Sequence, residues 1–136
     1  MKTILIADDS ANVRSIIREF LKDVPDLEIC GEAVNGLDAI EKAKKLKPNL
    51  VLLDLSMPQM NGIEVASILK KAMPGVLIVL FTMYSNSISK ALVSTIGVDA
   101  VLTKPDGMRQ IVDTVNAVLA TAHQPSNAAE QTENSA

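Results

Sequence analysis

The sequence is poor in the side chains that most often stack on bases and nucleotides. It contains no Trp, one Tyr and two Phe, so its hydrophobic content of 48% comes mainly from Leu, Ile, Val and Ala. Basic residues are not in excess, because 13 Lys and Arg are set against 16 Asp and Glu, for a net charge of −3. Polyanion-binding proteins carry a basic patch or stripe, so we expect no direct nucleic-acid binding by this chain.

Cysteine and histidine occur once each. A single cysteine, Cys30, excludes an internal disulfide, and its place in the apolar segment 27–30 predicts a small buried thiol rather than a redox centre. His123 has no cluster of Cys, Asp or Glu near it in the sequence. This isolation argues against a zinc site.

Long hydrophobic runs are also missing. No segment approaches the roughly 18 consecutive apolar residues of a membrane span. The first apolar run ends at Asp8 and is too short for a secretory signal. We therefore expect a cytoplasmic protein without membrane contact, and 136 residues fit about one domain.

Short apolar segments do recur along the chain. They are continuous rather than alternating, which is typical of strands covered on both faces. Four are strong and the second in order is weaker: TILIA at 3–7, LEICGEA at 27–33, LVLLDL at 50–55, VLIVLF at 76–81 and AVL at 100–102. The sequence therefore predicts five strands.

Amphipathic helical patterns lie between and after these strands. The first has Asp9 or Ser10 as its candidate N-cap and Pro25 beyond its end. The fourth has a thinner apolar stripe interrupted by Ser and Thr, so we expect it to be the most mobile. The predicted helices cover 13–21, 36–46, 61–73, 85–96 and a last one from about 107. This alternation predicts βα units and a parallel sheet between helix layers.

The C-terminal segment 123–136 contains no Val, Ile, Leu, Met or aromatic residue. Such a segment has little apolar surface to bury, so we expect a disordered tail after a domain that covers residues 1–122. An interdomain linker would have the same composition. The sequence leaves open whether the chain acts alone or is the N-terminal part of a longer regulator.

Chemically useful side chains follow the strong strands. In an open parallel sheet, ligands bind beyond the carboxyl ends of the strands, and there the chain carries Asp8, Asp9, Asp54, Thr82 and Lys104. Any one of them alone is ordinarily a turn or N-cap residue. Together, three carboxylates suit Mg²⁺, and a hydroxyl and an ammonium suit the oxygens of a phosphoryl group.

These residues resemble the bacterial two-component response-regulator receiver domain over about residues 1–122. The matching motifs are ILIADDS at 4–10, NG at 35–36, PNLVLLDLSMPQMNG at 48–62, VLIVLFT at 76–82 and LTKP at 102–105. The general pattern is similar to receivers of LuxR-type regulators. The resemblance implies a flavodoxin-like (βα)5 fold, a doubly wound five-stranded parallel sheet with strand order 2-1-3-4-5.

The resemblance also implies which residues bind the metal and the phosphoryl group. Asp54 would be the phosphoacceptor, attacking the phosphohistidine of a histidine kinase. Asp9, Asp54 and the main-chain carbonyl of Ser56 would bind Mg²⁺ directly, and Asp8 would reach it through water. Such a domain catalyses its own phosphorylation and dephosphorylation and is not an enzyme in the usual sense.

Further positions follow from the same resemblance. Lys104, after a cis peptide to Pro105, would pair with a phosphoryl oxygen. The hydroxyl of Thr82 would follow the phosphoryl group and shift a surface for a downstream effector or a homodimer. Pro58 and Gly62 would shape the loop after the phosphoacceptor.

The sequence departs from the family at its switch. Receivers usually carry Tyr or Phe three positions before the lysine, and here Val101 stands there. A branched aliphatic side chain cannot swing a ring between exposed and buried states. Tyr84 is a candidate replacement, and the simpler interpretation is that it lies exposed over the site and screens the phosphoryl group from water. The resemblance implies that the positions of Ser56 and Tyr84 tune dephosphorylation, and we expect the bulky Tyr84 to slow the attack of water.

Two rival functions remain. One is a stand-alone phosphorelay or phosphate-sink protein. If the chain is instead part of a longer regulator, we expect a C-terminal DNA-binding domain as its partner. The other is a phosphatase with an Asp nucleophile. Haloacid-dehalogenase-type phosphatases carry a second Asp two residues after the first, where this sequence has Ser56.

Overall fold

Strands and helices alternate along the chain in the computed structural model, which describes residues 1–82, 95–103 and 109–123. The elements are β1 (Lys2–Ala7), α1 (Ala11–Leu21), β2 (Leu27–Ala33), α2 (Gly36–Leu46), β3 (Leu50–Asp54), α3 (Gly62–Ala72), β4 (Leu77–Thr82), β5 (Ala100–Thr103) and α5 (Ile111–His123). The predicted helix at 85–96 lies mostly outside the described residues. So do Tyr84, Lys104, Pro105 and segment 124–136; α5 itself includes His123, which was predicted to belong to the tail.

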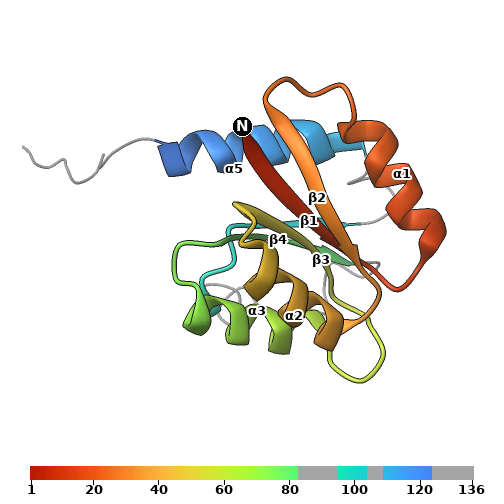
Figure 1. Ribbon diagram of the computed structural model, residues 1–136, viewed down its shortest axis with the longest axis vertical. Helices are drawn as coiled ribbons and strands as arrows, with labels where there is room; N and C mark the ends of the chain where they lie inside the picture. The colour runs from red at the N-terminus through yellow and green to blue at the C-terminus, as the bar shows by residue number, and fades with distance from the viewer. Residues whose placement is uncertain (83–94, 104–108, 124–136) are drawn as a thin grey trace, which may run out of the picture.

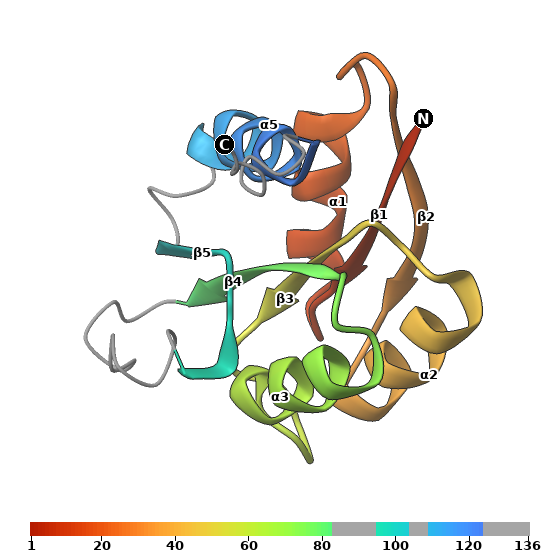
Figure 2. The ribbon, with the colours of Figure 1, turned by 90° about the vertical axis from the view of Figure 1, so that its left-hand side faces the viewer.

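The five strands form one parallel sheet in the order β2-β1-β3-β4-β5. This order confirms the predicted flavodoxin-like arrangement. In Figure 1 and Figure 2, α1 and α5 cover one face of the sheet and α2 and α3 cover the other. The three layers follow from the continuous apolarity of the strands, because every residue of β3 is buried.

Two apolar cores lie on the two faces of the sheet. On the α1/α5 face, Ile17 and Leu21 of α1 meet Val115 of α5 over the sheet. On the α2/α3 face, the small side chains of α2 and α3 pack on the odd residues of β1 and β3. Cys30, predicted to be buried, is only partly buried, because β2 is an edge strand.

Five strand boundaries differ by one residue from the predictions: the start of β1, the end of β3, both ends of β4 and the end of β5. β3 ends at Asp54 rather than at residue 55. The N–H of Leu55 still donates to the Phe81 carbonyl of β4 at 2.7 Å, but the Leu55 carbonyl accepts from Gly62 N–H at 2.7 Å instead of from the sheet. β4 begins at Leu77 rather than at residue 76, because the N–H of Val76 donates to the carbonyl of Met73 at 2.9 Å and closes the turn after α3.

Side-chain caps fix the start of the helices that follow the site loops. Ser10, one of the two predicted candidates, caps α1 by accepting from Val13 N–H at 3.3 Å. Asn61 caps α3 in a capping box with Glu64. Within the described residues, no helix has the length and apolarity that a membrane crossing requires.

Candidate functional site

Three carboxylates converge at the carboxyl ends of β1 and β3. The register pairs Ala7 with Leu53, so the residues that follow, Asp8 and Asp54, lie side by side. One carboxylate oxygen from each of Asp8, Asp9 and Asp54 lies within 4.8 Å of the other two. Adjacent parallel strands thus bring together residues that are far apart in the sequence.

Two of these carboxylates are almost completely removed from solvent. Asp8 is 1% exposed and Asp54 is 5% exposed, whereas Asp9 is on the surface. Carboxylates this close repel each other, and burial strengthens the repulsion. Hard oxygen ligands at this spacing, with one side open through Asp9, fit a divalent cation such as Mg²⁺.

Main-chain N–H groups orient the two buried carboxylates. Ser10 N–H donates to Oδ1 of Asp8 at 2.9 Å, and Ser56 N–H donates to Oδ1 of Asp54 at 3.2 Å. Each bond closes a short turn directly after a strand. The carboxylates are therefore held by the loops that leave the sheet.

The loop from β3 to α3 packs tightly under the site. A Cβ placed on Gly62 would lie 2.5 Å from the main-chain oxygen of Asp54 and 2.8 Å from Cα of Leu55. Glycine is required here by close approach of two backbone segments. Ser56 and Pro58 are exposed on the same loop, and Gln59 adopts a positive φ of 73°.

The remaining predicted residues lie on β4 and β5 or beyond them. Thr82, 1% exposed, is the last residue of β4, next to the strand that carries Asp54. Val101 pairs with Leu80 and packs, partly buried, on the α2/α3 face. Tyr84, Lys104 and Pro105 lie outside the described residues.

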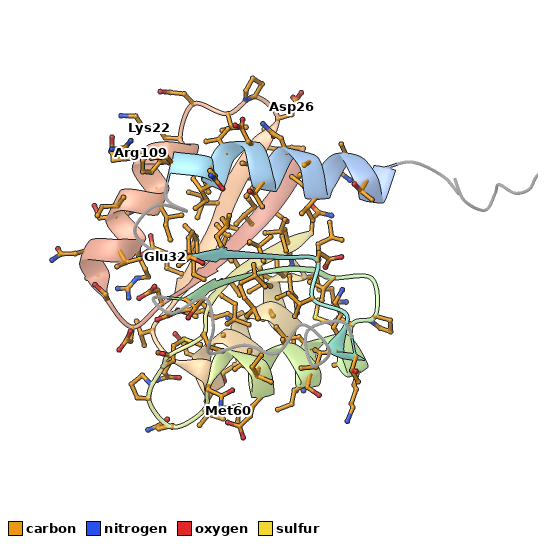
Figure 3. All side chains as sticks on the ribbon, turned by 180° about the vertical axis from the view of Figure 1, so that it is seen from behind. Lys22, Asp26, Glu32, Met60 and Arg109 are labelled. Carbon is orange, nitrogen blue, oxygen red and sulfur yellow. The ribbon has the colours of Figure 1, made fainter. Side chains whose placement is uncertain are left out.

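Sequence reasoning missed two charged residues beside the site. Arg14 of α1 donates from Nη1 to the main-chain carbonyl of Asp8 at 2.6 Å and from Nε to Glu32 of β2 at 2.9 Å. Figure 3 labels Glu32, which lies beside α1 at the end of the sheet. The one available signal was an arginine in the second turn of the helix that follows the acidic pair.

The family model for the response regulator receiver domain matches residues 4–116. The chain belongs to the receiver-domain family. Among its curated relatives is the response regulator protein VraR of Staphylococcus saprophyticus, 38% identical over 114 residues, which are 82% of this chain and 54% of VraR. The receiver chain thus spans about half the length of that relative.

Solved receiver structures agree with the fold. A DNA-binding response regulator of the LuxR family from Staphylococcus aureus is 29% identical with a TM-score of 0.79, over 87% of this chain and 98% of that one. The response regulator TrrA of Thermotoga maritima, in complex with Mg²⁺ and BeF, is 31% identical with a TM-score of 0.77, over 87% and 99%. The similarity to LuxR-type receivers is confirmed.

Proposed function

We propose that this receiver accepts a phosphoryl group on Asp54 from a histidine kinase, in a Mg²⁺-dependent reaction, and passes the signal to a partner surface. The observation that carries the proposal is the convergence of Asp8, Asp9 and Asp54 within 4.8 Å. The magnesium complex of the related TrrA receiver supports the choice of metal. A cytoplasmic location is part of the same proposal.

The acidic residues would bind the metal and provide the nucleophile. Asp9, Asp54 and the Ser56 carbonyl would hold Mg²⁺, with Asp8 bound through water. Bound Mg²⁺ would offset the negative charge of the carboxylates and of the phosphoryl oxygens. Nearly complete burial leaves the Asp54 carboxylate poorly solvated, which favours its use as a nucleophile once its charge is balanced.

The transfer step forms one bond and breaks one bond. A carboxylate oxygen of Asp54 attacks the phosphorus of the phosphohistidine, and the P–N bond breaks as the imidazole nitrogen leaves with the electron pair. Lys104 and the hydroxyl of Thr82 would bind the anionic phosphoryl oxygens. The product is an aspartyl phosphate.

The readout would run through the end of β4. Thr82 stands beside the acceptor strand, and β4 passes a shift on to β5, where Val101 pairs with Leu80. A partly buried valine has no ring to reorient, so we infer that Thr82 at the end of β4 carries the signal, and that Tyr84, which lies outside the described residues, slows the attack of water. In a longer regulator, the receiver would pass the signal to a C-terminal DNA-binding domain. The alternative response to phosphorylation would be homodimerisation of the receiver. The family match does not favour the phosphatase alternative.

Intact mass measurement after incubation with acetyl phosphate and Mg²⁺ tests the proposal. We expect the wild-type protein to gain the mass of one phosphoryl group and Asp54→Asn to gain none. Asp23→Asn, at an exposed carboxylate after α1, is the matched control and should gain the same mass as wild type. Absence of a gain in wild type, or an equal gain in Asp54→Asn, would overturn it.

A further inference from the structure

Asp8 is held by three hydrogen bonds to other described residues, two at its main chain and one at its side chain. Its N–H donates to the carbonyl of Ala33 at 3.1 Å, and its side chain accepts from Ser10 N–H. Its carbonyl accepts from Nη1 of Arg14 at 2.6 Å. This bond and the Ser10 bond are both charge-assisted, the first through its donor and the second through its acceptor, and the bond from Arg14 is the one that reaches the main-chain carbonyl.

The guanidinium of Arg14 is itself fixed by a second bond in a different direction. Nε donates to Oε1 of Glu32 at 2.9 Å, and the Arg14 side chain is only 14% exposed. A planar guanidinium can make these two bonds at once because its donors are rigidly spaced, whereas an ammonium offers one point of charge. Arg14 therefore links the turn after β1 to the end of β2.

Arg18 lies one helical turn further on and provides an internal comparison. It donates to the other oxygen of Glu32 at 3.0 Å, but its side chain is 49% exposed. Within the part of the chain that the structure describes, the Arg18 guanidinium bonds to Glu32 and not to the turn that carries the acidic pair. The two arginines share a carboxylate and differ in whether they bind Asp8.

We propose that Arg14 is a positioning residue for the magnesium site: it holds the Asp8 carbonyl, and so places the Asp8 and Asp9 carboxylates opposite Asp54. This inference rests on the proposed function. Groups that orient metal ligands typically change metal affinity by about 10- to 100-fold when they are removed. The expected consequence is weaker Mg²⁺ binding with the phosphoacceptor chemistry left intact.

The test compares Arg14→Lys and Arg14→Gln with Arg18→Gln. Mg²⁺ affinity is measured by calorimetry, and the rate of phosphorylation by acetyl phosphate is measured across Mg²⁺ concentrations. For both Arg14 variants we expect half-saturation to need about tenfold more Mg²⁺. The rate at saturating Mg²⁺ should recover to the wild-type range, and Arg18→Gln should match wild type in both measurements.

Each outcome decides between the two claims. If the wild-type protein neither binds Mg²⁺ nor becomes phosphorylated, the proposed function itself is overturned. A functional wild type with unchanged half-saturation in the Arg14 variants overturns the inference alone. Wild-type affinity in Arg14→Lys with weak binding in Arg14→Gln also overturns it, because charge alone would then suffice. Circular dichroism checks folding, and Arg14→Lys carries the test if Arg14→Gln unfolds.

Discussion

Replacing Gly62 by alanine should damage both stability and phosphorylation. The added Cβ would stand 2.5 Å from the main-chain oxygen of Asp54, against about 3.4 Å for an ordinary contact, so about 0.9 Å must be made up (3.4 minus 2.5). The opposing atoms are backbone and cannot rotate away. Overpacking of this kind costs roughly 1–3 kcal/mol, and the helix propensity of alanine returns at most about 1 kcal/mol. We expect a net loss of about 1–2 kcal/mol.

Urea unfolding followed by circular dichroism measures this loss, which corresponds to a midpoint lower by about 1 M. Gly75→Ala is the matched control, because a Cβ there meets nothing within 4 Å, and it should leave stability unchanged or raise it by up to about 1 kcal/mol. A displacement of the acceptor should slow phosphorylation of Gly62→Ala by roughly 10- to 100-fold at saturating Mg²⁺. Stability and rate both equal to wild type would refute the steric reasoning.

Three further predictions concern the site loops and the edge strand. Asn61→Ala removes the capping box of α3 and should cost about 0.5–2 kcal/mol in urea unfolding; an unchanged midpoint would count against the cap. Asp9→Asn relieves carboxylate repulsion, so in EDTA it should raise the free energy of unfolding by about 0.5–1 kcal/mol, while the stabilisation that Mg²⁺ gives wild type should disappear in thermal melts. Burial raises the pKa of the Cys30 thiol, so the folded protein favours the neutral thiol. The stability gained from the neutral thiol is present below the ordinary thiol pKa of 9.0 and is lost as the pH rises through the higher pKa of the folded protein. Iodoacetamide should accordingly react more slowly with native than with urea-unfolded protein at pH 8, and equal rates would contradict the shift.

The sheet was predictable because its strands are apolar on both faces and end in polar residues. Continuous runs such as 50–55 marked the strands, and the acidic residues after two of them marked the site edge. The neighbour order of the strands came only from the family resemblance, since apolar runs do not encode which strand pairs with which. The position of Asp8 beside Asp54 depends on that order.

Other features could not be predicted because they depend on contacts between distant residues. The bonds of Arg14 to Asp8 and to Glu32 join three elements, and a helix pattern marks such an arginine only as a polar position. The resemblance named Gly62 as a loop-shaping residue, but the physical reason, the close approach of α3 to the end of β3, came only from the structure. The later start of β4 likewise depends on the turn bond from Val76 N–H to the Met73 carbonyl, which takes the place of a bond in the sheet.

The most direct test of the central claim is to locate the phosphoryl group chemically. Borohydride reduces an aspartyl phosphate to homoserine. The protein is therefore incubated with acetyl phosphate and then treated with borohydride, and peptide sequencing identifies the residue that became homoserine. The account predicts homoserine at position 54 in samples with Mg²⁺ and unmodified Asp54 in samples with EDTA. Homoserine at Asp8 or Asp9, or an unmodified chain in the presence of Mg²⁺, would contradict it.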